Sequence, residues 1–494
     1  MTSQPTAAHE DGLVEWMDEL TVEFLNGDNT SFSTHRHGRR RRTYLGDGTE
    51  FHQLAFEGHW DELINRLEIL PREQLSPVFV VEKSTGFTFL HRAYANAGQK
   101  SFPPSRVMVW ILNAFPDLAK STASKGETPL HVACESAAIT SPDERLAVGI
   151  LVRAYPDGAA IIDNFHHETP LVMAMHSDWL VRIILDHKPM AASVRTRTGT
   201  LPIALNLNGK NILKLMLRAY PDAAFHRPVR SGKNLLLAHA CREGARFDVI
   251  RDILQVAGPG QFNIIDQTNP LFQFWRRMCM FGSRYFEVNG DNWKKAELLT
   301  KAAYSGLHNA DISLLHAAAG TYCPLGYLKM VAKTYPFQLS ERDRYGRVPL
   351  AVAVTIHTDI FSFHPKLLNM VLMSSVDTAG QRDYDRQTDA DGRTARTFSS
   401  SIKLLLSLCP LAARMADIDG RSPLFLALES GKEWGEGIEC LIQAAPEALK
   451  SRDTKYHLYP FMLAAVGSRS SVDTVFQLLL TCPEVAVVHN HQNL

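Results

Sequence analysis

The sequence predicts an all-α fold in which pairs of helices stack on one another as an α-solenoid. One observation is a recurring start of a helix, Gly-x-Thr-Pro-Leu or Gly-x-Ser-Pro-Leu, as at 126–130 and 420–424. A second is a proline at the end of a second helix, since Pro156, Pro189 and Pro221 are 33 and 32 residues apart. Repetition at a fixed period of this length is typical of solenoids.

Composition bounds the class of protein. The chain has 494 residues with 52 basic and 52 acidic side chains, so its charge is balanced. The hydrophobic fraction of 45% is typical of a folded soluble protein, and no apolar run approaches the roughly 18 residues of a membrane helix. The seven cysteines form no Cys-x-x-Cys pair, and no signal peptide is recognisable. We therefore expect reduced thiols and an intracellular protein, cytoplasmic rather than nuclear, without membrane contact.

Residues 1–47 differ from the remainder of the chain. Seven acidic residues and no Lys or Arg precede Arg36. The run Arg39–Arg42 is either an import or nucleic-acid patch or a solvated linker that pairs with the acidic segment. We expect this region to be partly disordered and separate from the solenoid. Apolar residues at helical spacing predict an amphipathic helix before Asn26-Gly27: Leu13, Trp16, Met17, Leu20 and Phe24.

The solenoid is expected to fill residues 48–494 with about nine to eleven helix pairs. Its clearest helix start is 126–135, where Gly126 permits a tight turn. Thr128 suits the N-cap, and Pro129 suits the first helical position because its missing N–H costs nothing there. Other first helices are predicted to begin within 51–55, 86–93, 168–174, 199–204, 232–236, 269–271, 313–318, 346–350, 420–424 and 459–464.

The second helix of each pair is expected to stop at a proline. Proline disfavours the α conformation of the residue before it, so a helix that reaches this point ends there. The sequence Tyr-Pro-Asp at 155–157 and again at 220–222 shows the pattern most clearly. The other prolines assigned to this role are Pro116, Pro189, Pro336, Pro410, Pro446 and Pro483.

Two stretches interrupt the repetition. The aromatic-rich stretch 272–293 is expected to be an insertion that packs its rings beneath itself or presents them as a sticky binding patch. The polar, turn-rich stretch 376–401 is expected to be a loop insertion. Within it, residues 389–394 echo residues 417–422, so an eroded start of a further helix pair is the alternative.

The helix starts resemble the ankyrin repeat, whose signature is Thr-Pro-Leu-His-x-Ala. The match is strong at 126–133 and good at Thr169, Pro349 and Pro423, and the resemblance covers about nine tenths of the chain. The chain departs from the family where a Gly usually closes the second helix, because a Pro stands near that place. This departure leaves the turn geometry and the curvature open, and another solenoid of helix pairs is the alternative fold.

No catalytic constellation stands out in the sequence. We find no Gly-x-x-x-x-Gly-Lys loop, no Gly-x-Ser-x-Gly elbow and no kinase signature set. His91, His131 and His316 occupy the His position of the Thr-Pro-Leu-His pattern, and the resemblance implies that they hydrogen-bond the backbone around the turn. Isolated histidines make poor metal sites. We expect no enzyme activity, no cofactor and no metal.

The resemblance implies a scaffold or adaptor that binds another protein on a concave face of turn tips and first helices, and takes no small-molecule substrate. The balanced charge argues against nucleic acid. A nuclear regulator that uses Arg39–Arg42 is the alternative function, and an enzyme with an unrecognised site is a third. Aromatic and Arg side chains often dominate interfaces. The predicted protein-binding residues near turn tips are Phe165, His166, Arg195, Arg197, Arg344, Tyr345 and Tyr456.

Overall fold

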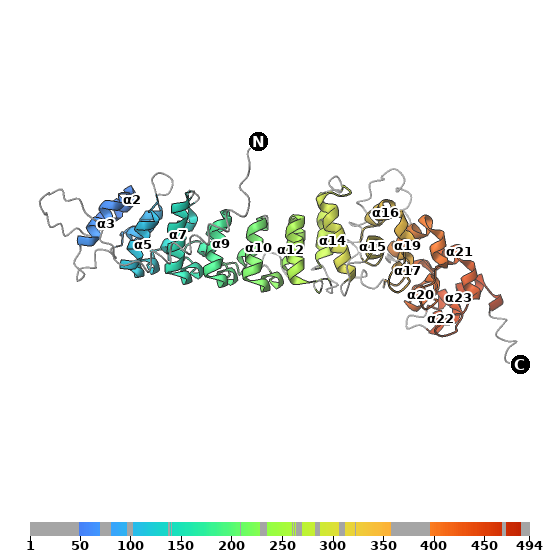
Figure 1. Ribbon diagram of the computed structural model, residues 1–494. Coiled ribbons are helices and arrows are strands. Elements are labelled where there is room, and N and C mark those ends of the chain that lie inside the picture. The colour runs from blue at the N-terminus through green and yellow to red at the C-terminus, as the bar shows by residue number, and fades with distance from the viewer. Residues whose placement is uncertain are drawn as a thin grey trace, which may run out of the picture. The chain divides into compact units, whose positions relative to one another are not determined.

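The computed structural model describes residues 49–69, 81–95, 102–136, 139, 141–207, 209–227, 235–258, 260, 262, 269–281, 287–305, 312–321, 323–356, 396–466 and 471–485. Within these ranges the chain forms 21 α-helices and several short 3₁₀ helices, and no strand is present (Figure 1). The prediction of an all-α fold is confirmed for this part of the chain. The chain divides after Arg230 into two compact units, which we call the N-terminal unit and the C-terminal unit.

The described part of the N-terminal unit contains five successive helix pairs. First helices contact the first helix of the next pair, from α2 to α4, α6 and α8, and second helices do the same from α3 to α5, α7, α9 and α10. The pairs are α2 (Thr49–Glu57) with α3 (Trp60–Ile69), α4 (Phe89–Ala95) with α5 (Ser105–Ala114), α6 (Pro129–Glu135) with α7 (Pro142–Ala154), α8 (Pro170–Met173) and η4 (Ala174–His176) with α9 (Asp178–His187), and η6 (Pro202–Ala204) with α10 (Lys210–Ala219).

The C-terminal unit contains six described pairs that pack in the same manner. Its first helices contact one another from α15 to α17, α20 and α22, and α11 contacts α13. The pairs are α11 (Leu236–Glu243) with α12 (Phe247–Ala257), α13 (Pro270–Phe281) with α14 (Asp291–Ser305), α15 (Leu314–Ala319) with α16 (Leu325–Thr334), α17 (Pro349–Val354) with α19 (Arg396–Leu408), α20 (Pro423–Glu429) with α21 (Ile438–Ala444), preceded by η14 (Trp434–Glu436), and α22 (Pro460–Val466) with α23 (Val472–Thr481).

The helix-start pattern places a buried apolar residue in the first helix of five of these pairs. The residue after the helix-start proline is buried wherever the full pattern occurs. Leu171 and Leu350, for example, are 0% and 1% exposed. Burying such a side chain stabilises the fold by about 1.5–3 kcal/mol. The equivalent buried residues of the other pairs are Leu130, Ile203 and Leu424.

Eight described second helices end at a residue outside the α region that directly precedes a proline. Tyr155 is representative, with φ −144° and ψ 76°. The prediction that these helices stop at proline is confirmed. The sequence pattern did not predict the 3₁₀ helices that follow, in which buried residues such as Ala159 and Ala191 face the neighbouring helices. These 3₁₀ helices are η2 (Pro116–Lys120), η3 (Pro156–Ala160), η5 (Pro189–Ser193), η7 (Pro221–Phe225), η11 (Pro336–Leu339), η13 (Pro410–Arg414) and η15 (Pro446–Lys450).

The stretch 272–293, expected to be an insertion, is mostly helical. Residues 272–281 continue α13, and α14 begins at Asp291. Leu271, Phe274 and Trp275 have the i, i+3, i+4 spacing of a helix face, and all three are buried. Phe274, Trp275 and Trp293 therefore belong to the core of the C-terminal unit, while Phe272 is half-buried, and the aromatic run interrupts the sequence pattern without interrupting the helix.

The stretch 376–401 also differs from the expected loop. Residues 396–401 form the beginning of α19, because the helix extends back from the buried stripe of Ile402, Leu405 and Leu406. The N–H of Ile418 donates to the carbonyl oxygen of Tyr345 at 3.1 Å, so the turns before α17 and α20 are direct neighbours. Helix α19 therefore completes the pair that α17 begins. The remainder of the stretch, including the echo at 389–394, lies outside the described residues.

Candidate binding surface

Seven described turns precede a first helix, four with five residues and three with six, and the same hydrogen bond closes each of them. In each turn the N–H of the first residue donates to the carbonyl oxygen of the last, at 2.8–3.0 Å. One residue of each turn has positive φ: Gly86, Gly126, His167, Gly199, Gly346, Gly420 and His457. We call the turns 82–87, 123–127, 163–168 and 196–200 the N-terminal turn row, and the turns 343–347, 417–421 and 453–458 the C-terminal turn row.

Hydrogen bonds join neighbouring turns within each row, except that the described residues show none between the turns 163–168 and 196–200. The turns approach so closely that a Cβ at Gly346 would lie 2.8 Å from the backbone nitrogen of Ile418. Glycine is therefore needed here for close approach as well as for its φ of +70°. The bonds between turns run from Ser124 N to Thr85 O at 3.0 Å, from Asn164 N to Lys125 O at 2.6 Å, from Ile418 N to Tyr345 O at 3.1 Å, and from the Thr454 hydroxyl to Asp419 O at 2.6 Å.

Four turns begin with an aspartate whose carboxylate accepts hydrogen bonds from the turn backbone. Asp163 accepts from the N–H groups of Phe165, His166 and Glu168, at 3.0, 2.6 and 2.6 Å. Burial by itself raises the pKa of Asp163, but these bonds outweigh burial and the pKa lies below its ordinary value. The charge of each aspartate is thus directed at its own turn. The other three are Asp343, Asp417 and Asp453.

The three histidines of the Thr-Pro-Leu-His pattern are buried and join neighbouring helix pairs, as His52 also does through the carbonyl oxygen of Phe87, and the structural role predicted for these three is confirmed. The N–H of Thr128 donates to Nδ1 of His131 at 3.0 Å, so the ring proton is on Nε2. That nitrogen donates to the carbonyl oxygen of Ile161, in the next pair, at 3.1 Å. The equivalent bonds run from His91 to the carbonyl oxygen of Glu127, at 3.0 Å, and from His316 to that of Arg347, at 2.8 Å.

Burial keeps these three rings neutral. It lowers the pKa of His91 to about 4. It also lowers the pKa of His131 and of His316 below the ordinary value. Each ring is therefore a neutral bridge between two turns at physiological pH, and protonation would place a second proton on the nitrogen that accepts a hydrogen bond.

All seven residues predicted to lie near turn tips are exposed. The most exposed aromatic rings are Phe165, Tyr345 and Tyr456, at 60%, 45% and 50%. In the N-terminal turn row the rings of Phe165 and His166 meet edge to face at 4.6 Å. Arg195 lies immediately before the next turn and Arg197 within it, and Nη1 of Arg195 donates to the carbonyl oxygen of Gly199 at 3.1 Å.

Cations that the prediction omitted lie against the exposed rings. Nζ of Lys125 is 4.4 Å from the ring centroid of Phe165, in the neighbouring turn. Nζ of Lys455 lies 4.5 Å from the ring of Tyr456. The adjacency of Lys455 and Tyr456 in sequence could have indicated the second contact. The first joins residues of different turns, and only the stacking of the turns brings them together.

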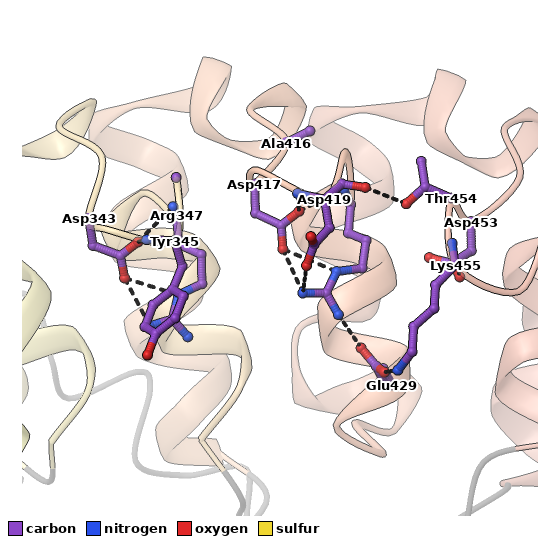
Figure 2. Close-up of polar contacts among 12 residues, drawn as sticks. Asp343, Tyr345, Arg347, Ala416, Asp417, Asp419, Glu429, Asp453, Thr454 and Lys455 are labelled. Carbon is purple, nitrogen blue, oxygen red and sulfur yellow. Dashed lines mark hydrogen bonds and ion pairs between the residues drawn. The ribbon is translucent and has the colours of Figure 1, made fainter. Parts of the chain in front are cut away.

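In the C-terminal turn row, two guanidinium groups flank one tyrosine ring. The guanidinium carbons of Arg344 and Arg347 lie 4.7 and 4.8 Å from the ring centroid of Tyr345. Arg347 also forms an ion pair with Asp343 at 2.8 Å, and Figure 2 shows these two residues beside Tyr345. Arg344 is exposed, and among the described residues it has no carboxylate partner.

Acidic side chains neutralise the next turn of the same row. Arg421 forms ion pairs with Asp417 at 2.9 Å and with Asp419 and Glu429 at 3.0 Å. Lys455 reaches the same Glu429 at 3.1 Å, which Figure 2 shows. The carboxylates therefore join the second and third turns of the row into one charge network.

The described residues contain no metal-binding cluster and no membrane-spanning helix. Within the described ranges no group of three or more His, Cys, Asp and Glu residues could hold a metal ion. None of the helices described is both long and apolar enough to span a bilayer. The run Arg39–Arg42 lies outside the described residues. No known family of proteins matches this chain, and a comparison with curated proteins finds no relative.

Proposed function

We propose that this chain is a non-enzymatic scaffold that binds another protein on the exposed tips of its turn rows. The observation that carries the proposal is the pairing of an exposed ring with a cation at the tips, as for Phe165 with Lys125 and Tyr345 with Arg344. Tyr and Arg are enriched among the residues that dominate binding energy. Hydrogen bonds already order the turn backbones, so binding would cost little further conformational entropy.

We also propose that the fold is an ankyrin-like α-solenoid. Three features support this: successive helix pairs in contact, turns before helices that start with proline, and a buried His that bridges neighbouring turns. A solenoid offers an extended surface in place of a closed pocket, which suits a protein ligand better than a small molecule. The absence of a recognisable catalytic motif in the sequence agrees with a binding role.

The test compares capture of partners from an extract of the source cells by two triple variants of the full-length protein. Exposed side chains of the 3₁₀ helices provide matched controls, because they have similar exposure (Met190 57%, Phe337 67% and Leu411 66%) and are not part of the turns. The tip variant carries Phe165→Ala, Tyr345→Ala and Tyr456→Ala, and the control variant carries Met190→Ala, Phe337→Ala and Leu411→Ala.

We expect the tip variant to lose partners that the wild type and the control variant retain. A hot-spot residue contributes about 2 kcal/mol or more, so affinity for a recovered partner should fall at least tenfold. Thermal melting should change little in either variant, since exposed substitutions usually cost about 0.5 kcal/mol or less. Equal loss of partners in both variants, or full capture by the tip variant, would contradict the proposal.

A further inference from the structure

The N-terminal turn row presents cations to solvent without exposed acids. Within its turns, and counting Arg195 directly before the last of them, every exposed charged side chain is basic. Phe165 adds an exposed ring among these cations. The row therefore combines positive charge with apolar surface, which are the two features that an acidic amphipathic segment would complement. The exposed cations are Lys83, Lys125, Arg195 and Arg197.

The acids of the same row are turned inward or already paired. Glu127 and Asp163 are 8% and 0% exposed. Glu82 accepts a hydrogen bond from Arg92 at 2.6 Å, and Glu168 is half-buried. Glu127 is close enough to Lys125 for their charges to interact, but among the described residues none of these carboxylates forms an ion pair with an exposed cation of the row.

The C-terminal turn row differs in this respect. Its half-buried arginines are neutralised, Arg347 by Asp343 and Arg421 by Asp417 and Glu429. Figure 2 shows Asp343 and Asp417 within the turns and Glu429 at the end of α20. Of the four cations in the turns of this row, Arg347, Arg421 and Lys455 form ion pairs, and among the described residues Arg344 forms none. An acidic ligand would therefore have to displace existing ion pairs at three of the four, whereas the exposed cations of the N-terminal turn row form no ion pair with a described acid of that row.

The chain itself contains a segment of matching chemistry. Residues 10–28 carry seven acids and no Lys or Arg, and Leu13, Trp16, Leu20 and Phe24 recur at helical spacing. Twenty residues separate Asp28 from Thr49, where α2 begins. Such a linker reaches up to about 65 Å when extended. Helix α2 lies one helix pair before the row, so with axes about 10 Å apart the far turn of the row lies roughly 40 Å from that pair. The linker is therefore long enough.

We propose that residues 10–28 bind the N-terminal turn row of the same chain. Their carboxylates lie against Lys125, Arg195 and Arg197, and their apolar face lies against Phe165. The inference rests on the proposed function, because it assigns an occupant to the same turn tips. An outside partner that uses this row must then displace the segment, and the acidic segment sets the charge that such a partner has to match.

The first measurement uses full-length protein in which the seven acids are replaced by amides, which frees the row. A fluorescent synthetic peptide of residues 8–28 is titrated into this variant and into the wild type, with anisotropy as the readout. We expect the peptide to bind the amide variant and to bind the wild type at least about tenfold more weakly, because the tethered segment competes at an effective concentration of about millimolar. Binding should weaken as salt is raised.

The matched control is a pair of double variants in the amide background. Arg195 and Arg342 each precede a turn and donate from Nη1 to the carbonyl oxygen of its glycine, at 3.1 and 2.8 Å. Arg197 and Arg344 are the second residues of those turns. Arg195→Glu with Arg197→Glu should reduce peptide affinity about tenfold or more, while Arg342→Glu with Arg344→Glu should leave it within about twofold, since electrostatic pairing is local at physiological salt.

Each outcome decides the inference. Absence of binding to the amide variant at about 1 mM peptide, the effective concentration of a short tether, overturns it. An equal effect of both double variants overturns it as well. So does no effect of either, which would indicate pairing with Arg39–Arg42. If the Arg195→Glu and Arg197→Glu protein does not fold, Arg197→Glu alone replaces it.

The inference and the proposed function can fail separately. If the peptide does not bind but the turn-tip variants still lose outside partners, the acidic segment is not the occupant and the scaffold proposal stands. If the peptide binds through Arg195 and Arg197 while the turn-tip variants retain every outside partner, the row serves the chain itself and the scaffold proposal is wrong.

Discussion

At Gly126 in the N-terminal turn row and at Gly420 in the C-terminal turn row, the backbone has the same φ of +75°. The residues that follow these glycines behave differently. Glu127 is buried, whereas Arg421 extends to three carboxylates. The comparison teaches that a few positions determine the turn backbone, while the side chains at the tips are free to differ. The two rows can therefore present different electrostatic environments on one framework, with exposed cations unpaired among the described residues in one and ion-pair networks in the other.

The largest effects on stability are expected from replacing turn glycines with alanine, which tests how closely neighbouring turns are stacked in each row. A Cβ at Gly86 or at Gly346 would lie 2.5 or 2.8 Å from a backbone nitrogen of the next turn. Gly86→Ala and Gly346→Ala should each cost about 2–4 kcal/mol, because overpacking adds to the penalty of positive φ. Gly420→Ala is the control, since its Cβ would meet only a threonine side chain, at 3.0 Å or more, and should cost about 1–2 kcal/mol. Urea unfolding measures all three, and equal costs would show that the turns are not tightly stacked.

Lowering the pH should destabilise the N-terminal unit more than the C-terminal unit. The unfolded chain takes up protons at its histidines near pH 6.5. Because the folded pKa of His91 is lowered to about 4, its contribution is complete above pH 6.5 and is lost as the pH falls toward 4. For His91 the loss between pH 7 and pH 5 is about 2 kcal/mol. The other histidines with lowered pKa are His131 and His226 in the N-terminal unit, and His239 and His316 in the C-terminal unit.

Hydrogen exchange at pH 7 and pH 5, corrected for its intrinsic pH dependence, would measure this loss in each unit. We expect the N-terminal unit to lose more protection, because it contains three of these five histidines and the strongly shifted His91. His91→Gln should flatten the pH dependence of that unit while lowering its stability at pH 7. Earlier opening of the C-terminal unit would contradict the assignment.

Replacing a paired arginine of the C-terminal turn row should cost more stability than replacing an arginine of the N-terminal turn row that has no described ion pair. The side chain of Arg421 is 19% exposed and forms ion pairs with Asp417, Asp419 and Glu429. Arg421→Ala should cost about 1–2 kcal/mol, after allowance for solvent screening, because it leaves the buried Asp417 without its cation. Arg197→Ala removes an exposed side chain and should cost less than about 0.5 kcal/mol. Thermal melting measures both, and similar costs would remove the distinction between the rows.

The smallest effect concerns the two turns that place a histidine at positive φ. His167 and His457 have φ of +56° and +54°, where the other five turns have glycine. Glycine adopts this conformation without strain, so His167→Gly and His457→Gly should each stabilise the protein by about 0.5–1 kcal/mol. A loss of stability on either substitution would show that the imidazole makes a contact worth more than the strain. Gly199→Ala, the converse change in a neighbouring turn, should destabilise.

The features that could be predicted from the sequence depend on interactions between residues close together in the chain. Pro129 and the prolines equivalent to it start first helices, prolines such as Pro156 end second helices, and His131 bonds the backbone around its turn as expected. Each of these outcomes depends on residues a few positions apart. The stretch 272–293 shows the limit of such local patterns. Its aromatic residues break the repeated pattern, although residues 272–281 continue α13 and Leu271, Phe274 and Trp275 have the i, i+3, i+4 spacing of a helix face.

The sequence by itself determined the all-α class, the starts and ends of the best-marked helices, and the exposure of the seven predicted tip residues, because proline, glycine and apolar spacing act through the chain's own backbone. Only the tertiary structure decided which charges meet. Lys125 lies over Phe165 from the turn before it, and α19 completes the pair of α17 across the undescribed residues 357–395. Such contacts arise from the stacking of one helix pair on the next. The residue spacing within a single pair does not predict them, because it contains no information on how the next pair packs.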